Sequence, residues 1–282
     1  MKSQLQIDQT PIAYTESGQG ENTVVLLHCS ASSSAQWRTL SGVLEQDFRV
    51  LAPDFYGYGE SAAWPGHTPL TLAQEVAAVV ALTERFEKPI HLVGHSYGGA
   101  VALKAALSNA MQLQSLTLIE PVAFHLLDVE DADFLDEILG IGNAVASALT
   151  SGDYHRGMQR FVDYWNGDGV WSQLTDDKRA ALARYSSRVA LDFWSTTTEE
   201  TTLDACSELD VPTLILCGEH TPAPTQRITT LLEKTIPTTR QQTIAGAGHM
   251  LPLTHADVVN AAIAEHLARN SELEPLSHLQ AA

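Results

Sequence analysis

The chain alternates between short, mainly apolar segments and amphipathic segments from its beginning. The apolar segments have the length and composition of β-strands, and those that are apolar throughout are expected to be buried on both faces of a sheet. The predicted strands are the alternating polar and apolar segments 4–8 and 10–16, the mainly apolar segments 23–27, 48–52, 90–93, 116–119 and 211–216, and the more polar segment 240–244. Segments with helical periodicity lie between them, at residues 37–44, 72–83, 99–107, 225–234 and 257–269. Strands that alternate with helices predict a mostly parallel sheet with helices on its faces.

The alternation is interrupted once, between residues 124 and 206, where the sequence is helical in character. We therefore predict that a helical cap is inserted into an α/β core. The predicted boundaries are residues 1–123 for the first part of the core, 124–206 for the cap, 207–270 for the second part of the core and 271–282 for a polar tail.

A chain of 282 residues, 44% of them hydrophobic, can bury a sizeable core. Its formal net charge of −18 repels nucleic acid and anionic membranes, so neither is expected as a partner. The first residues lack the apolar core of a signal peptide, and no apolar stretch reaches membrane-spanning length. We therefore expect a cytoplasmic protein whose partner is a small-molecule substrate. The composition leaves the oligomeric state open.

The most informative motif is Gly94-His95-Ser96-Tyr97-Gly98, which follows a predicted strand and opens a predicted helix. A serine between a strand and a helix lies on a tight, strained turn, and its hydroxyl projects from the end of the sheet. The N-terminus of the helix, the positive end of its dipole, faces the place where an oxyanion would form. The motif predicts a nucleophilic serine. The alternative is a serine that only caps the following helix.

A serine hydroxyl needs a base to become a nucleophile at neutral pH. His249 follows the last predicted strand, in a glycine-containing loop that can bring its imidazole over the carboxyl edge of the sheet. His249 is therefore the predicted base. His255 is the nearest rival, but its position predicts the start of the final helix.

The oxyanion of a serine intermediate needs hydrogen-bond donors. The predicted donors are the backbone N–H groups of Tyr97, next to the nucleophile, and of Ser30, in the loop after residues 23–27. This serine-rich loop could also supply an N-cap for the helix that follows it, and both roles are compatible because the oxyanion donor is the backbone.

These features together resemble the α/β-hydrolase superfamily, in the form that carries a cap. The resemblance covers almost all of residues 5–270. Besides the serine motif it rests on His28-Cys29, Asp54-Phe55-Tyr56-Gly57-Tyr58-Gly59-Glu60-Ser61, Leu118-Ile119-Glu120-Pro121, Cys217-Gly218-Glu219 and Gly248-His249. It implies an eight-stranded, mostly parallel α/β-hydrolase sheet flanked by helices, with an inserted helical cap. These motifs are specific for the fold and the nucleophile, but not for the substrate.

The acid that should orient the histidine is not in its usual place. In this superfamily it commonly follows the seventh strand in a pattern resembling Gly-Glu-x-Asp, but Thr221 occupies the aspartate position here. Some relatives place the acid after the sixth strand, where this chain has Glu120. Glu219, two residues before Thr221, is the other candidate. We favour a Ser96–His249–Glu120 triad, with Glu219 as the alternative acid.

The predicted cap is rich in aromatic residues, which supply either an apolar substrate-binding surface or the core of the cap itself. They are Tyr154, Phe161, Tyr164, Trp165, Trp171, Tyr185, Phe193 and Trp194. Among them we predict that Trp165, Tyr164 and Trp194 bind substrate.

The sequence therefore predicts a serine hydrolase that cleaves a carboxylic ester with an apolar group through an acyl-enzyme on Ser96, without a metal or an organic cofactor. A serine-dependent C–C bond hydrolase of ring-cleavage products is an alternative, because such relatives share the capped fold and the serine triad. A non-catalytic ligand-binding or sensor protein is another, motivated by Thr221 at the usual position of the acid.

Overall fold

In the computed structural model, which describes residues 2–127 and 129–271, the chain folds around one eight-stranded sheet with the strand order β1-β2-β4-β3-β5-β6-β7-β8. The strands are β1 (Lys2–Ile7), β2 (Thr10–Ser17), β3 (Asn22–Leu27), β4 (Phe48–Pro53), β5 (Ile90–His95), β6 (Leu113–Ile119), β7 (Thr213–Gly218) and β8 (Thr239–Ile244). The β1–β2 and β2–β4 pairs are antiparallel, and all the others are parallel. The predicted sheet is confirmed.

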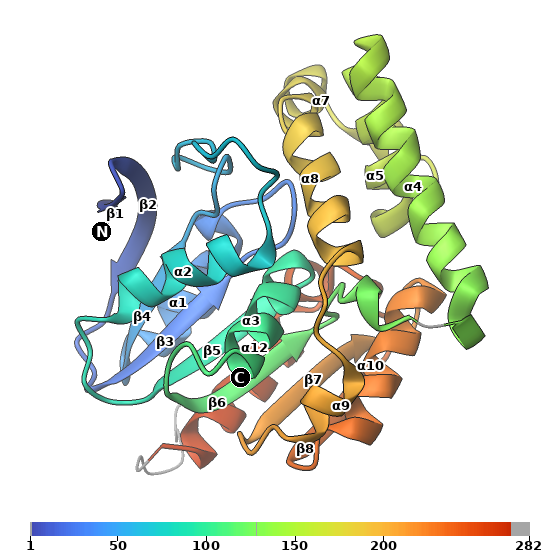
Figure 1. Cartoon of the computed structure of the whole chain (residues 1–282). Coiled ribbons are helices and arrows are strands. Elements are labelled where there is room, and N and C mark those ends of the chain that lie inside the picture. Colours follow the sequence, from blue (N-terminus) through green and yellow to red (C-terminus); the bar gives the residue numbers. More distant parts are fainter. Residues whose placement is uncertain (1, 128, 272–282) are drawn as a thin grey trace.

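Helices cover both faces of the sheet and fill the interval between β6 and β7 (Figure 1). The α-helices are α1 (Arg38–Leu44), α2 (Leu72–Thr83), α3 (Tyr97–Leu107), α4 (Ala132–Ser151), α5 (Tyr154–Asn166), α6 (Val170–Gln173), α7 (Asp176–Ala183), α8 (Ser186–Thr197), α9 (Leu203–Ser207), α10 (Ala223–Thr235), α11 (Leu251–Thr254) and α12 (Ala256–Arg269). Three short 3₁₀ helices, η1 (Ser34–Trp37), η2 (Phe124–Leu126) and η3 (Val129–Asp131), join them. Within the described residues, no helix is both long and apolar enough to cross a bilayer.

The continuous apolar runs are explained by two hydrophobic layers, one on each face of the sheet. Successive side chains of a strand point to opposite faces. In β3, Val25 and Leu27 therefore pack towards α2 and α3, whereas Val24 and Leu26 pack towards α1 and α12. Because both faces are covered by helices, a polar residue on either side of a central strand would be buried, and the run has to be apolar throughout.

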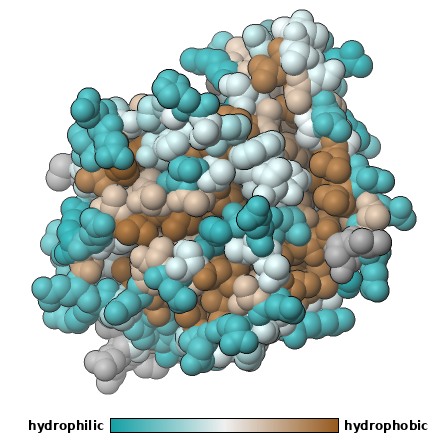
Figure 2. Space-filling view, in the orientation of Figure 1, coloured by the Kyte–Doolittle hydropathy of each residue, from teal (hydrophilic) through white to brown (hydrophobic). Residues whose placement is uncertain are grey.

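Helices α4 to α8, which we call the helical insert, stand together beyond one edge of the sheet (Figure 1). Among them α4 packs against both α5 and α8. Figure 2 shows hydrophobic residues running along the insert between α8 and α4, with hydrophilic residues around the outline of this face. Of the predicted polar tail at residues 271–282, only Ser271 falls within the described part of the chain.

Parallel strands bring their carboxyl ends to the same edge of a sheet. Here the loops that follow β3, β5, β6, β7 and β8 meet at the edge next to the insert. The three residues of the predicted triad, Ser96, Glu120 and His249, each lie in one of these loops. The final helix begins after His255, as predicted, and this rival to His249 occupies the N-cap position of that helix.

The turn between β5 and α3 needs glycine because α3 begins directly against the end of β3. A Cβ on Gly98 would lie 2.3 Å from the carbonyl oxygen of Leu27 and 2.6 Å from that of His28. Both obstacles are backbone atoms, which cannot move aside as a flexible side chain would.

We therefore expect Gly98→Ala to destabilise the protein by about 1–3 kcal/mol, the usual cost of overpacking. Gly140→Ala is the matched control, because a Cβ at this exposed site in α4 meets nothing within 4 Å. That variant should be neutral or gain up to about 1 kcal/mol of helix propensity. Urea unfolding curves measure both effects, and equal midpoints for the two variants would contradict the packing argument.

Candidate functional site

Ser96 occupies the turn between β5 and α3 in a strained backbone conformation. Its φ of 56° and ψ of −116° are unusual for a residue other than glycine. The conformation is held by three backbone hydrogen bonds. Ser96 N donates to Ile119 O at 2.9 Å, and Ser96 O accepts from Ala100 N at 3.0 Å and from Val122 N at 3.3 Å. The side chain is only 5% exposed.

A continuous chain of hydrogen bonds leads from this serine to a buried carboxylate. The Oγ of Ser96 lies 2.9 Å from Nε2 of His249, and Nδ1 of His249 lies 2.6 Å from Oε2 of Glu120. A carboxylate can only accept, so Nδ1 carries the proton and Nε2 is left to accept from the serine hydroxyl. All three side chains are buried. The structure thus brings together the three residues of the favoured triad.

Glu120 is held by donors from the loop that follows β7. Gly218 N donates to its Oε1 at 2.6 Å, and the Thr221 hydroxyl donates to its Oε2. Thr221 stands at the usual sequence position of the acid, and its hydroxyl hydrogen-bonds the Glu120 carboxylate, which comes from the neighbouring strand. The sequence contained this signal, because a hydroxyl at a vacated acid position is a suitable donor for an acid supplied by the neighbouring strand.

Glu219 is not part of the hydrogen-bonded series that joins Ser96, His249 and Glu120. Its Oε2 accepts from Gly246 N at 2.8 Å, and its side chain is 54% exposed. In an extended strand Glu219 would project to the same side as Thr221, and this is why it is the alternative acid. However, β7 ends at Gly218, and the next residues form a turn in which that alternation no longer holds.

Three of the six non-glycine residues with a positive φ in the described part of the chain lie around this site. Ser96, Glu120 and Ala31 have φ values of 56°, 45° and 55°, in the region that normally favours glycine. Such conformations cost of order 1–3 kcal/mol each and persist where the surroundings fix them, often at functional sites. Their coincidence in three separate loops, around one serine, is independent support for a functional site here.

The loop after β3, residues 28–31, is positioned by the buried imidazole of His28. Phe55 N donates to Nε2 of His28 at 3.1 Å, so the proton is on Nδ1, which donates to Cys29 O at 2.7 Å. Burial lowers the pKa of His28 to about 4, and the ring stays neutral. In a trans peptide the carbonyl and the next N–H point in opposite directions. The bond to Cys29 O therefore fixes the direction of the Ser30 N–H.

The other predicted donor belongs to Tyr97, the first residue of α3. An N–H in the first turn of a helix has no carbonyl acceptor within that helix. Ser30 and Ser96 both line the cavity beside this helix N-terminus. The loop after β3 and the N-terminus of α3 therefore flank the serine, as an oxyanion site requires.

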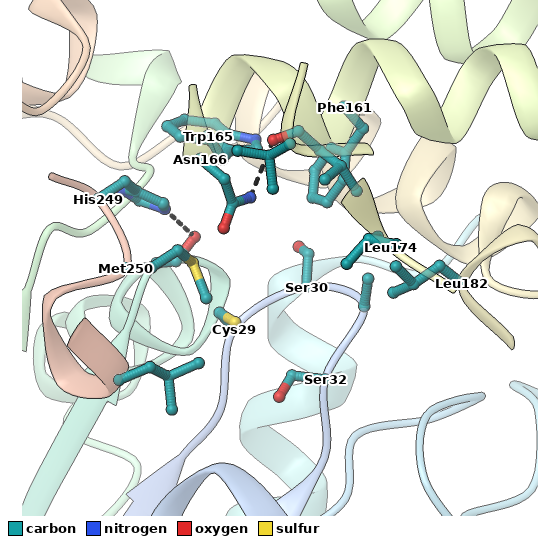
Figure 3. Close-up of a pocket in the computed structure, with 15 residues that line it drawn as sticks. Cys29, Ser30, Ser32, Phe161, Trp165, Asn166, Leu174, Leu182, His249 and Met250 are labelled. Atoms are coloured by element: carbon teal, nitrogen blue, oxygen red, sulfur yellow. Dashed lines mark hydrogen bonds between the residues drawn. The ribbon is translucent and has the colours of Figure 1, made fainter. Parts of the chain in front are cut away.

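The cavity in front of Ser96 has a volume of about 220 Å³ and a mainly apolar lining (Figure 3). Part of the lining comes from the helical insert and from the chain after β8. These apolar residues are Phe161, Val162, Trp165, Val170, Leu174, Leu182, Met250 and Leu253. The described lining includes no Lys, Arg, Asp or Glu, and a second, smaller hollow against Ser96 is bordered by Asp192. The main cavity suits an apolar group.

Of the three aromatic residues predicted to bind substrate, only Trp165 lines this cavity. Its ring lies on the imidazole of His249, with 4.0 Å between centroids (Figure 3). Tyr164 instead hydrogen-bonds Glu137 at 2.6 Å, and Trp194 is 39% exposed. Phe193, next to Trp194, borders the smaller hollow beside Ser96 instead, and Phe161, three residues before Tyr164, lines both hollows. Residues adjacent in a helix are about 100° apart around its axis, so periodicity alone could not identify the inward face.

A buried polar cluster that the sequence argument missed ties the insert to the core. Arg188 of α8 donates to Tyr56 O at 2.7 Å, to Glu75 of α2 at 2.6 Å and to Asp192 one turn further along α8. The hydroxyl of Tyr58 donates to the other oxygen of Asp192 at 2.5 Å. Burial, opposed by Arg188, raises the pKa of Glu75 to about 7.

Comparison with known proteins agrees with this fold. The sequence model described as "Alpha/beta hydrolase family" matches residues 24–262. Lipase LipV of Mycobacterium tuberculosis is 26% identical over 256 residues, which cover 88% of this chain and 94% of the lipase. The pimeloyl-[acyl-carrier protein] methyl ester esterase of Edwardsiella ictaluri is 27% identical over 252 residues, with the same two coverages, 88% and 94%.

A solved structure shows the same fold. The meta-cleavage product hydrolase CumD of Pseudomonas fluorescens IP01 superposes with a TM-score of 0.72. The match is 18% identical in sequence and covers 95% of this chain and 98% of that one.

Removing Arg188 should leave two buried acids without their cation. We expect Arg188→Met to cost about 3–5 kcal/mol, as is typical when one partner of a buried ion pair is removed. Arg179→Met is the control, because Arg179 pairs with Asp176, which is 93% exposed. Such surface pairs contribute about 0–1 kcal/mol. Urea denaturation compares the two, and a similar small loss in both would contradict a structural role of the cluster.

Proposed function

Because the chain belongs to the alpha/beta hydrolase family, we propose that it is a serine hydrolase that cleaves carboxylic esters. The observation that carries the proposal is the hydrogen-bond chain from Ser96 through His249 to Glu120. A serine with a base in contact, and an acid that orients the base, is the arrangement that activates an alcohol as a nucleophile.

In the proposed reaction Ser96 Oγ attacks the ester carbonyl while Nε2 of His249 accepts the hydroxyl proton. The buried Glu120 carboxylate stabilises the resulting imidazolium. The N–H groups of Ser30 and Tyr97 donate to the oxyanion. The tetrahedral intermediate then collapses, the C–O bond to the alcohol breaks, and His249 gives its proton to the departing alcohol. Water, activated by the same imidazole, hydrolyses the acyl-enzyme and restores the serine.

The cavity indicates the kind of ester. Its apolar lining favours a substrate with an apolar acyl or alkyl group next to the carbonyl. The names of the lipase and of the methyl ester esterase describe ester cleavage by relatives that align with 88% of this chain. Ester hydrolysis by this chain is inferred from this similarity together with the cavity.

A C–C bond hydrolase is the second candidate. A 2-hydroxy-6-oxo-2,4-heptadienoate hydrolase of Pseudomonas putida is 29% identical over 170 residues, which is 59% of this chain and 55% of that enzyme. Its named substrate carries a carboxylate. Among the described residues, neither hollow beside Ser96 is lined by a Lys or Arg, and one is bordered by Asp192. An anionic substrate would lack a cation to pair with, so we favour the neutral ester.

A fluorophosphonate probe tests the serine. We expect stoichiometric labelling of the wild type at Ser96 and none of Ser96→Ala, because phosphonylation needs the activated hydroxyl. Short p-nitrophenyl esters and vinylogous diketone acids should then be offered to a separate sample of wild-type enzyme that has not met the probe, and we expect the esters to be turned over faster. A faster reaction with the acids would favour the C–C hydrolase, and an unlabelled wild type would favour a non-catalytic binding protein.

The acid is tested by a matched pair of amide substitutions. Glu120→Gln should lower kcat by about three to four orders of magnitude, because the histidine loses its orienting carboxylate. Glu219→Gln should remain close to the wild type, since this exposed side chain contacts Gly246 N and lies 4.0 Å from the His220 imidazole, and neither residue belongs to the proposed triad. Ester kinetics under saturating substrate measure both variants. Full activity in Glu120→Gln would eliminate the proposed triad.

A further inference from the structure

His95, the residue immediately before Ser96, has a buried side chain that the proposed reaction does not use. Its Nε2 lies 2.9 Å from the backbone carbonyl oxygen of His249. Its Nδ1 lies 3.1 Å from the side-chain nitrogen of Gln36. The Oε1 of Gln36 in turn accepts from Cys29 N at 3.0 Å. One side chain next to the nucleophile thus connects to the chain segments of the proposed base and of the oxyanion donor.

The direction of every hydrogen bond in this chain follows from its one unambiguous donor. The N–H of Cys29 can only donate, so the oxygen of the Gln36 amide faces it and the NH₂ group faces His95. The NH₂ group donates, and Nδ1 of His95 must therefore be unprotonated. A neutral imidazole then carries its proton on Nε2, where it donates to His249 O. Each donor is then matched with an acceptor, and only the Nε2-protonated tautomer of His95 allows all three hydrogen bonds to form.

The surroundings keep His95 in this neutral form. Burial, with the nearby His249 as a second cause, lowers the pKa of His95 to about 3. The centroids of the His95 and His249 rings are 5.2 Å apart. Because a cation on His95 would oppose the imidazolium that forms on His249, a neutral ring is also what the proposed reaction requires.

We propose that His95 and Gln36 are positioning residues that fix the loops of the base and of the oxyanion donor relative to the nucleophile. The proposal rests on the serine-hydrolase function. The need for such a link follows from the topology, because Ser96 follows β5, whereas His249 follows β8, three strands further along the sheet. Ser30 follows β3, on the other side of β5. The hydrogen bonds of His95 and Gln36 span both of these distances across the sheet, close to the serine.

Gln36→Glu tests the link with almost no change of shape. The carboxylate still accepts from Cys29 N–H but cannot donate to Nδ1 of His95. We expect His95 to place its proton on Nδ1, and His249 O then loses its donor. With the base loop displaced, kcat for an ester should fall roughly 10- to 100-fold, as small misplacements of reacting groups do. KM should stay close to the wild-type value, since neither side chain lines the main cavity.

The matched control is Gln114→Glu. Gln114 lies at the opposite end of β6 from the site, and its Nε2 donates to Asn270 O at 2.6 Å. The same substitution there should leave kcat and KM unchanged. A purely structural role for Gln36 predicts a lower Tm at unchanged kcat, so Tm is measured for both variants.

Long-range ¹H–¹⁵N correlation spectra of the imidazoles give a second readout that does not depend on turnover. The wild type should show His95 protonated at Nε2 and not at Nδ1, and Gln36→Glu should show the reverse. A wild-type ring protonated at Nδ1, or an unchanged kcat in Gln36→Glu, would overturn the proposal. If the wild type hydrolyses no ester and resists the fluorophosphonate, the proposed function itself fails. The positioning role then fails with it, and the tautomer decides only whether the hydrogen-bond chain exists.

Discussion

The site depends on one buried carboxylate and on the donors that surround it. Glu120 is fully buried, and an ionised group in that position is tolerable only when it is hydrogen-bonded. Its partners are Gly218, Thr221 and His249, which come from the ends of two further strands. The carboxylate that orients the imidazole through Oε2 therefore also holds the loops after β6, β7 and β8 together. Stability of this edge and alignment of the site have a common cause.

The imidazoles near the serine have different tautomers, and the hydrogen bonds of each ring determine which nitrogen carries the proton. His28 carries its proton on Nδ1 because Phe55 N–H occupies the other nitrogen, whereas the hydrogen bonds of His95 require the proton on Nε2. Burial lowers the pKa of both. His249 alone has a carboxylate on one nitrogen and the serine hydroxyl on the other. Among these three rings, His249 is therefore the one placed to exchange a proton with the serine.

Much of this could be predicted from the sequence, and what could not has physical reasons. Apolar runs identified the strands because helices cover both faces of the sheet, and the glycines around Ser96 identified the turn. The choice between Glu120 and Glu219 depended on how the chain turns after β7, which no periodicity encodes. Helical periodicity likewise could not separate Phe193 from Trp194, and it gave no sign that Arg188 would be buried, because its acidic partners come from distant segments.

The cluster around Arg188 has a consequence for how a substrate enters. Swinging α8 outward would separate Arg188 from Glu75 and from the carbonyl of Tyr56, and would strip buried ions of their partners. The Arg188 cluster therefore opposes an outward movement of α8. Leu253, by contrast, borders the cavity with 54% of its surface exposed. On that flank, beside Leu253, the rim of the cavity reaches the surface of the molecule.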